Sequence, residues 1–245
     1  MSNQTRISVF RSNDEFEQKA AEKIARFLSE SIRERGKASI ALSGGETPRG
    51  VYRRLSLEPF KKRIEWKKIH IFFSDERAVP PKDPQSNFGM AERELLSRVE
   101  IPKANIHRIL GEIDPSHAAK KYEEELKKTL RGKGTRFDII LLGLGEDGHT
   151  ASLFPGAADV KPKGPLVAPV DLPALKNKRI TLTLRCINAA RSVIFLVTGR
   201  KKAPMIQRLL GTEEPTSNIP ATLVHPKDGK VVWVLDEEAG ASLFS

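Results

Sequence analysis

The stretch FDIILLGLGEDGH, residues 137–149, joins an apolar run to a glycine-rich segment. Residues 137–142 predict a buried strand, and three glycines then interrupt the chain. In open α/β sheets, ligands bind beyond the carboxyl ends of the strands. The sequence therefore predicts a loop that brings Asp147 and His149 to a ligand site.

His149 has the chemistry of a proton-transfer residue. Histidine is the side chain whose ordinary pKa suits proton transfer near neutrality. A neighbouring carboxylate such as Asp147 can orient the ring and stabilise its protonated form. A purely structural histidine is the alternative, but the position of His149 beside a carboxylate in a strand-end loop favours function. The other histidines lack metal-ligand spacing, so we expect no required metal.

The same glycines match the dinucleotide-binding pattern G-x-G-x-x-G, which is a competing interpretation. That pattern needs a helix after its last glycine and an acidic residue about 20 positions later. Here Pro155 and Gly156 would end such a helix within two turns, and Lys163 stands at the acidic position. We therefore do not expect a bound dinucleotide.

Composition limits the class of protein. A chain of 245 residues forms one large domain or two small ones, and the even alternation of its segments favours one domain, residues 1–245. No apolar run approaches the ~18 residues of a membrane helix, and the first residues lack the apolar core of a signal peptide. The single Cys186 lies in a strand-like segment and predicts a buried packing thiol. It fits a reducing compartment, so we expect a cytoplasmic protein.

The net charge of +11 raises the question of nucleic acid. The basic residues are scattered and interleaved with glutamate, and aromatic residues make up only 6%, too few for an evident base-stacking platform. We expect a solvated basic surface with no nucleic-acid or membrane partner. Its positive field would attract a small phosphorylated substrate.

Strand-like and helix-like segments alternate along the chain. The predicted strands are residues 6–10, 39–43, 68–73, 137–142, 179–187, 192–197 and 230–235. The predicted helices run from a capping box at Ser12-x-x-Glu15 to Gly36, from Thr47-Pro48 onward, over about 86–99, from Asp114-Pro115 through Leu130, and over 200–210. This order implies a mainly parallel sheet with helices on both faces, and a surface excursion at residues 156–175.

Ser43, Gly44, Gly45 and Thr47 form a candidate phosphate cradle between a strand and a helix. Adjacent glycines let the backbone approach a ligand closely, and a helix N-terminus presents unpaired N–H groups and a positive dipole. No Gly-Lys-Ser/Thr follows, so the segment is not a P-loop. An ordinary strand-to-helix turn with Thr47 as the cap is the alternative.

Two further charged segments follow strands. Residues 74–77, SDER, place Asp75 and Arg77 on the ligand side of the sheet; a surface turn with an ion pair is the alternative. Residues 199–203, GRKKA, put Lys202 near a helix start, which is unfavourable for the helix dipole unless an anion binds there. A solvated basic turn is the alternative.

Several of these segments together resemble the 6-phosphogluconolactonase family. They are SGGxTP at 43–48, DERxVP at 75–80, SN at 86–87, GxGxDGHTASLFPG at 143–156, RxTxT at 179–183 and GxxKA at 199–203. They appear in the family's order. The resemblance implies a Rossmann-like α/β fold shared with glucosamine-6-phosphate deaminases and ribose-5-phosphate isomerases. It also implies hydrolysis of 6-phospho-D-glucono-1,5-lactone to 6-phospho-D-gluconate in the oxidative pentose phosphate pathway, without a cofactor.

Two other functions compete with lactone hydrolysis. Glucosamine-6-phosphate deaminases resemble the chain in the glycine cradle, but they typically carry Asn where Asp147 stands and Phe-Asn-Glu-Pro where this chain has residues 152–155. A non-catalytic sugar-phosphate regulator usually carries a helix-turn-helix segment, for which we expect no room here. Both comparisons favour the lactonase. The sequence does not indicate the oligomeric state.

The resemblance and the residues together suggest how the substrate phosphate is bound. We expect it on the backbone of Gly44 and Gly45 at the start of the following helix. Lys202 and Arg179 would neutralise its charge.

The catalytic roles are expected as follows. His149 takes a proton from the water that attacks C1 and returns it to the ring oxygen. Asp147 or Asp75 orients the imidazole, and the sequence does not choose between them. Arg77 stabilises charge on the carbonyl oxygen or binds a sugar hydroxyl.

Overall fold

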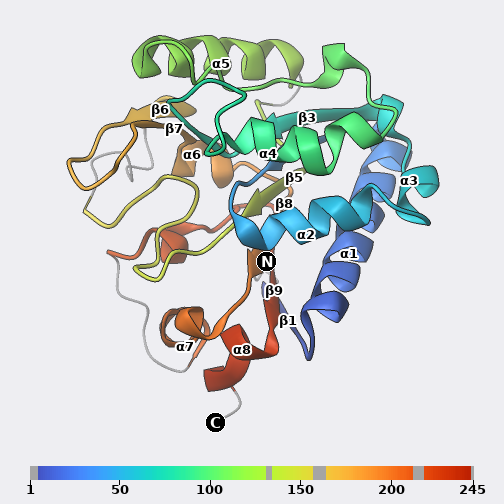
Figure 1. The fold of residues 1–245 in the computed structure, drawn as a ribbon, viewed down its shortest axis with the longest axis vertical. Coiled ribbons are helices and arrows are strands. Elements are labelled where there is room, and N and C mark those ends of the chain that lie inside the picture. Colours follow the sequence, from blue (N-terminus) through green and yellow to red (C-terminus); the bar gives the residue numbers. More distant parts are fainter. Residues whose placement is uncertain (1–4, 131–133, 157–163, 212–217, 244–245) are drawn as a thin grey trace.

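A six-stranded parallel sheet forms the centre of the protein in the computed structural model, which describes residues 5–130, 134–156, 164–211 and 218–243 (Figure 1). The strand order is β1-β9-β8-β5-β2-β3, and every neighbouring pair is parallel. The strands are β1 (Thr5–Phe10), β2 (Ala38–Leu42), β3 (Ile69–Phe73), β5 (Ile139–Leu142), β8 (Ser192–Val197) and β9 (Lys230–Asp236). The predicted α/β class with a mainly parallel sheet is confirmed.

A second, antiparallel sheet was not predicted. It has the order β4-β7-β6, from β4 (Asp75–Arg77), β7 (Arg179–Leu182) and β6 (Val167–Val170). β4 has three residues, and β6 lies inside the range expected to be a surface excursion. Short strands of this kind give a weak sequence pattern, and β4 pairs with β7 about 100 residues away. Residues 157–163 of that range, including Lys163, lie outside the described residues.

The predicted strand 179–187 is wrong beyond Leu182. The chain leaves the sheet at Thr183, and Leu184–Ile187 form the helical turn α6, with the N–H of Ile187 donating to Thr183 O at 2.9 Å. A short apolar run does not distinguish a strand from a buried helical turn. Cys186 lies in this turn with no exposed surface, so the expected burial of its thiol is confirmed.

The helices largely begin and end where the sequence signals indicate. They are α1 (Asn13–Arg35), α2 (Glu46–Leu55), α3 (Phe60–Arg63), α4 (Asn87–Glu94), α5 (Pro115–Thr129), α7 (Ala203–Leu210) and α8 (Glu237–Gly240). Ser12 Oγ accepts a hydrogen bond from Glu15 N, and Gly36 ends α1 with φ +76°. The predicted helix over 86–99 stops earlier, because α4 ends at Glu94 and a 3-10 turn follows.

The helices pack on the sheet in separate groups (Figure 1). α1 contacts β1, β2 and β9 and lies alongside α2, whereas α5 packs on β6 and β7. In Figure 1, α5 lies at the top above β3, and α7 and α8 lie at the bottom near β1 and β9. Tyr122 of α5 fixes the end of β3: its hydroxyl accepts from Phe73 N at 2.7 Å and donates to Phe73 O at 3.0 Å. Among the described helices, none is long and apolar enough to cross a membrane.

Candidate active site

Four loops meet at the carboxyl edge of the parallel sheet, after β2, β3, β5 and β8. They enclose a cavity of about 320 Å³, a size suited to a small-molecule ligand. Its lining includes eight of the ten predicted site residues: Ser43, Gly44, Gly45, Thr47, Asp75, Arg77, His149 and Lys202. Asp147 and Arg179 do not line the cavity. Asp147 contacts the imidazole of His149, and Arg179 is the cross-strand partner of Arg77.

The cradle after β2 is held rigidly by α2. The hydroxyl of Tyr52 accepts from Ser43 N at 2.9 Å and donates to Ser43 O at 2.8 Å. A Cβ on Gly44 would lie 1.8 Å from Asn87 Oδ1, so only glycine fits there. Ser43 is 4% exposed, and its Oγ is buried without a hydrogen-bond partner. An unsatisfied buried hydroxyl at a cavity wall is a group that a ligand can satisfy.

The expectation that Thr47 caps the helix is wrong. α2 begins at Glu46, and its N-cap is Gly45, whose φ of +103° suits glycine. The Thr47 hydroxyl instead lies 2.7 Å from Thr198 Oγ1, in the loop after β8. Glu46 and Thr47, the first residues of α2, line the cavity, and N–H groups in a first helical turn have no partner within the helix. The strand-to-helix turn therefore presents donors suited to an anion.

His149 and Asp147 are in direct contact. His149 Nδ1 lies 2.6 Å from Asp147 Oδ1, and His149 N donates to the same oxygen at 3.1 Å. A Cβ on Gly145 would lie 2.0 Å from His149 Nδ1, so this glycine makes room for the ring. Among the described residues none is hydrogen-bonded to Nε2 of His149, and the side chain lines the cavity. The arrangement leaves Nε2 available to a ligand or to water.

The pKa of Asp147 lies below its ordinary value. Burial alone would raise the pKa of this half-exposed carboxyl, but the backbone N–H, the positive charge and the side-chain hydrogen bond of His149 together lower it. Asp147 is therefore ionised near neutral pH and can hold the imidazole in one orientation.

Asp75 has different partners. It is 8% exposed; its Oδ2 accepts from Ser152 Oγ at 2.6 Å, and its Oδ1 accepts from Asn87 Nδ2 at 3.2 Å. Asp147, and not Asp75, contacts the imidazole of His149. Asp75 links the loop after β5 to the start of α4 through its hydrogen bonds. Asp75 still lines the cavity, so its expected catalytic role stays a prediction.

Arg77 and Arg179 lie side by side on β4 and β7, where they are cross-strand partners. Arg77 donates to Gln85 O at 3.0 Å and to Asn87 Oδ1, which directs its guanidinium toward the cavity. Arg179 Nη1 is buried without a partner. Burial, together with the charge of Arg77, lowers the pKa of Arg179, although Asp75 and Glu76 oppose this.

Asn87 is a residue of the site that the sequence did not predict. Its Nδ2 donates to Asp75 O at 2.9 Å, its Oδ1 accepts from Arg77, and the residue lines the cavity. Buried Glu76 holds it in place, because the Glu76 carboxylate accepts from Asn87 N at 2.7 Å and from Phe88 N at 2.8 Å. The sequence motif SN at residues 86–87 is the feature from which a site role for Asn87 could have been predicted. Burial raises the pKa of Glu76, although the backbone hydrogen bonds that it accepts oppose this.

Lys202 reaches the cavity from the loop after β8. It ends the 3-10 turn Arg200–Lys202, directly before α7, so the predicted helix over 200–210 is confirmed with a tighter first turn. Within the described ranges, no group of three or more His, Cys, Asp or Glu side chains could hold a metal ion.

Residues 11–233 match the protein family described as glucosamine-6-phosphate isomerases/6-phosphogluconolactonase. The chain belongs to this family. A family member from Synechocystis sp., named 6-phosphogluconolactonase, is 40% identical over 224 residues, covering 88% of this chain and 89% of that protein. One of the same name from Rattus norvegicus is 35% identical over 241 residues, covering 97% of this chain and 93% of that protein.

Solved structures in the family have the same fold. The 6-phosphogluconolactonase from Thermotoga maritima has a TM-score of 0.83 at 33% identity, covering 95% of this chain and 100% of that chain. The enzyme of this name from Trypanosoma brucei has a TM-score of 0.85 at 30% identity, covering 99% of this chain and 100% of that chain. A monomeric glucosamine-6-phosphate deaminase has a TM-score of 0.80 at 22% identity, a likeness of fold alone. The expectation that the family shares its fold with deaminases is confirmed.

Proposed function

We propose that this protein hydrolyses 6-phospho-D-glucono-1,5-lactone to 6-phospho-D-gluconate in the oxidative pentose phosphate pathway. The observation that carries the proposal is the shared cavity: the His149 imidazole, oriented by Asp147, and the cradle of Ser43, Gly44 and Gly45 line the same space. The names of the relatives described above support it.

The phosphate of the substrate binds at the cradle. The N–H groups at the start of α2 donate to its oxygens, the Ser43 hydroxyl supplies the donor that has no protein partner, and Lys202 neutralises its charge. Arg179 adds positive charge from beside Arg77. This remote binding positions the lactone ring for attack and converts binding energy into catalysis.

Hydrolysis follows at the other end of the cavity. A water molecule attacks C1 while His149 Nε2 takes its proton, and the carbonyl oxygen becomes negatively charged. Arg77 stabilises that oxygen. The C1–O5 bond then breaks, the imidazolium returns the proton to O5, and the product is an open-chain acid with a free hydroxyl. Asp147 keeps Nδ1 protonated, so that Nε2 is the nitrogen that accepts.

The decisive experiment is a coupled assay. Glucose-6-phosphate dehydrogenase generates the lactone, and phosphogluconate formation is followed after subtraction of spontaneous hydrolysis. We expect catalysed hydrolysis, and we expect His149→Ala to lower kcat by about 10²–10⁴-fold, the range of general acid–base catalysis. The exposed His117→Ala is the matched control and should keep full activity. Normal kcat in His149→Ala would remove His149 from this role.

A second assay, which follows ammonia release, tests the alternative function. Glucosamine 6-phosphate, offered to the same enzyme, should release no ammonia. Rapid ammonia release with no effect on the lactone would make the protein a deaminase, and tight binding of both sugar phosphates without turnover would make it a sensor.

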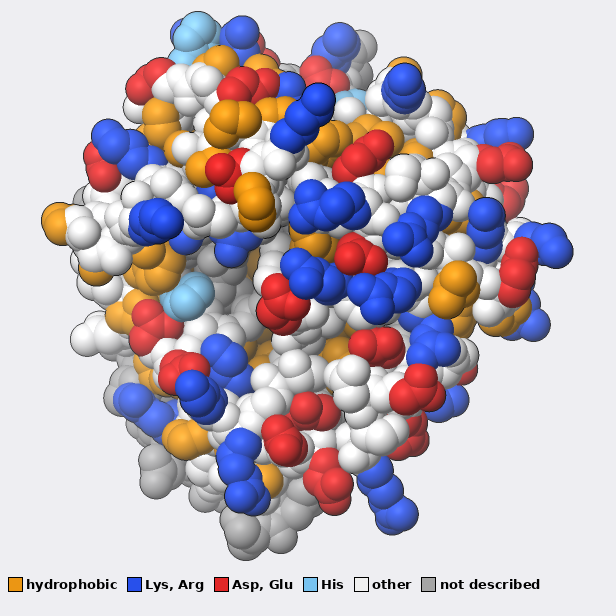
Figure 2. Space-filling view, in the orientation of Figure 1, with side chains coloured by type: hydrophobic (Ala, Val, Ile, Leu, Met, Phe, Trp, Pro, Cys, Tyr) orange, Lys and Arg blue, Asp and Glu red, His pale blue; other side chains and the backbone are white. Residues whose placement is uncertain are grey.

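The remaining expectations belong to this proposal. We propose one domain over residues 1–245, supported by the continuous hydrophobic core that the two sheets share. We also propose a cytoplasmic location, supported by the single buried thiol of Cys186, and no nucleic-acid partner. Figure 2 supports the last point, because Lys and Arg side chains on the face shown are interspersed with Asp and Glu.

A further inference from the structure

A second polar cavity lies at the opposite edge of the parallel sheet. It has a volume of about 240 Å³ and opens beside the amino-terminal ends of β2 and β5. Its charged lining residues are Arg35, Lys37, Arg136, Arg191 and Asp138. Asp138 directly precedes β5 and Gly143 directly follows it, so at ~3.3 Å per residue the two cavities lie roughly 16 Å apart. The second cavity is therefore separate from the site proposed for the lactone.

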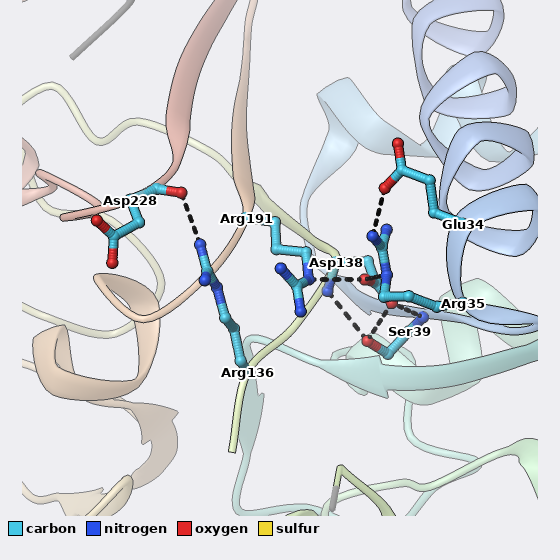
Figure 3. Close-up of polar contacts among 7 residues, drawn as sticks. All are labelled: Glu34, Arg35, Ser39, Arg136, Asp138, Arg191 and Asp228. Atoms are coloured by element: carbon cyan, nitrogen blue, oxygen red, sulfur yellow. Dashed lines mark hydrogen bonds and ion pairs between the residues drawn. The ribbon is translucent and has the colours of Figure 1, made fainter. Parts of the chain in front are cut away.

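Asp138 is the anionic centre of this cavity (Figure 3). The carboxylate is 8% exposed, and its Oδ2 accepts from the N–H and the hydroxyl of Ser39 at 2.8 and 2.9 Å. Its Oδ1 accepts from Arg35 Nε at 2.9 Å and lies 3.3 Å from Arg191 Nε. One carboxylate thus serves two arginines and a serine, and its charge can offset only one of the cations.

Arg136 is the least satisfied of the cations. Its Nη2 donates to the backbone carbonyl of Asp228 at 2.6 Å, while its Nε is buried without a partner. In the described part of the chain no carboxylate forms an ion pair with Arg136. Burial lowers the pKa of Arg136, and the nearby charges of Arg191 and Arg35 lower it further, whereas Asp228 and Asp138 oppose the shift. The cations here therefore outnumber the carboxylates that form ion pairs with them.

The lining carries four cationic side chains against the single carboxylate of Asp138. Glu34, outside the lining, also pairs with Arg35, so a surplus of two positive charges remains. Nε of Arg136 and Nε of Arg191 are both buried without a hydrogen-bond partner among the described residues. A purely structural network would pair these donors, as it pairs Arg35 with Asp138 and with Glu34. The unpaired donors and the surplus charge instead suit a bound anion.

We propose that this cavity is a second anion site, which binds a small polyvalent phosphate between the guanidinium groups of Arg136 and Arg191. Planar guanidinium groups match the oxygens of a phosphate and bind it through paired, charge-assisted hydrogen bonds. Lys37 contributes long-range attraction from the rim. The uncharged part of the lining includes Ala38 and Leu130 and the polar residues Ser39, His70 and Thr129.

The test measures pyrophosphate binding by isothermal titration calorimetry on the full chain. The Lys202→Ala background weakens anion binding at the first cavity, so that the second dominates. We expect saturable binding that Arg136→Gln weakens by at least about tenfold, the effect of losing a charged hydrogen bond. Because Arg136 forms no ion pair with a described carboxylate, this variant should fold normally. Arg33→Gln, an exposed arginine two residues before Arg35 on α1, removes the same charge and should bind normally.

Two results would overturn the proposal. Equal affinity in Arg136→Gln and the Lys202→Ala background would place the anion elsewhere. Equal weakening by Arg33→Gln and Arg136→Gln, or binding that sodium chloride of the same ionic strength removes, would indicate an adventitious ion only. Lactone hydrolysis is measured in parallel without added phosphate; Arg136→Gln should leave it unchanged, which separates this proposal from the proposed function.

Discussion

The carboxylate of Asp147 lies 2.6 Å from Nδ1 of His149, two residues along the same loop. The contact is local in sequence, although a distant segment also holds the loop, because Gly148 O accepts from Ala221 N at 3.2 Å. Gly145 and Gly148 supply the loop geometry: the first leaves room for the ring, and the second adopts φ +82°. The pair therefore depends on the conformation of the loop after β5.

Asp147→Asn should lower kcat strongly without a comparable change in KM. The amide keeps the shape of the carboxylate but loses its charge, and its NH₂ group can favour the wrong imidazole tautomer. We expect a loss of about 10²-fold or more, at the low end of general acid–base effects. Steady-state kinetics at saturating lactone measure it. Glu146→Gln, which removes a charge from the adjacent position, serves as the control; if both variants behave alike, the effect is one of net charge.

Lys202→Ala should chiefly weaken substrate binding. Loss of a charged hydrogen bond costs about 1.5–3 kcal/mol, so KM should rise by roughly ten- to 150-fold while kcat changes less. The adjacent Lys201, which is exposed and does not line the cavity, provides Lys201→Ala as a matched control. An unchanged KM in Lys202→Ala would show that its ammonium does not contact the phosphate.

Gly44→Ala should disrupt the site through Asn87. The added Cβ would lie 1.8 Å from Asn87 Oδ1, closer than any real contact allows. Asn87→Gly removes the obstructing side chain but also the acceptor that holds Arg77. We therefore expect both single variants to lose activity and the double variant to be no worse than Asn87→Gly alone. Additive losses in this double-mutant cycle would mean that the two residues do not interact.

Stability should fall as the pH drops through the ordinary histidine range. Burial lowers the pKa of both His70 and His107; each also lies near a lysine that lowers it further, and Glu125 opposes the shift at His107. His70 Nδ1 lies 3.0 Å from His107 Nε2, so one ring must donate and the other accept. The unfolded chain therefore binds protons that the folded chain resists, and the free energy of unfolding is highest above about pH 6.5 and declines below it.

Urea unfolding at several pH values measures this decline. His107→Gln keeps hydrogen-bonding capacity without a titrating ring, and its stability should depend less on pH between about 5 and 7, the range around the ordinary histidine pKa. His225→Gln, at an exposed position, should behave like the unmodified protein. Identical pH dependence in all three would rule out the buried pair as its source.

The sequence predicted those parts of the fold that depend on short-range patterns. The parallel strands, the capping of α1 by Ser12 and the loop with Asp147 and His149 all follow from neighbouring residues. The sheet of β4, β7 and β6 does not, because its strands have only three or four residues and β4 pairs with β7 about 100 residues away. Asn87 was missed for the same reason: it reaches the cavity only because α4 packs beside β4.

Two tyrosines, the whole complement of this chain, make the same bridge at neighbouring strands. Tyr52 spans the N–H and carbonyl of Ser43 after β2, and Tyr122 spans those of Phe73 at the end of β3. Burial raises the pKa of both phenols above the ordinary value. Ultraviolet absorption by tyrosinate should therefore be absent in mild alkali while these hydrogen bonds at the edge of the cavity are intact. Its appearance would show that the hydrogen bonds of the two tyrosines have broken.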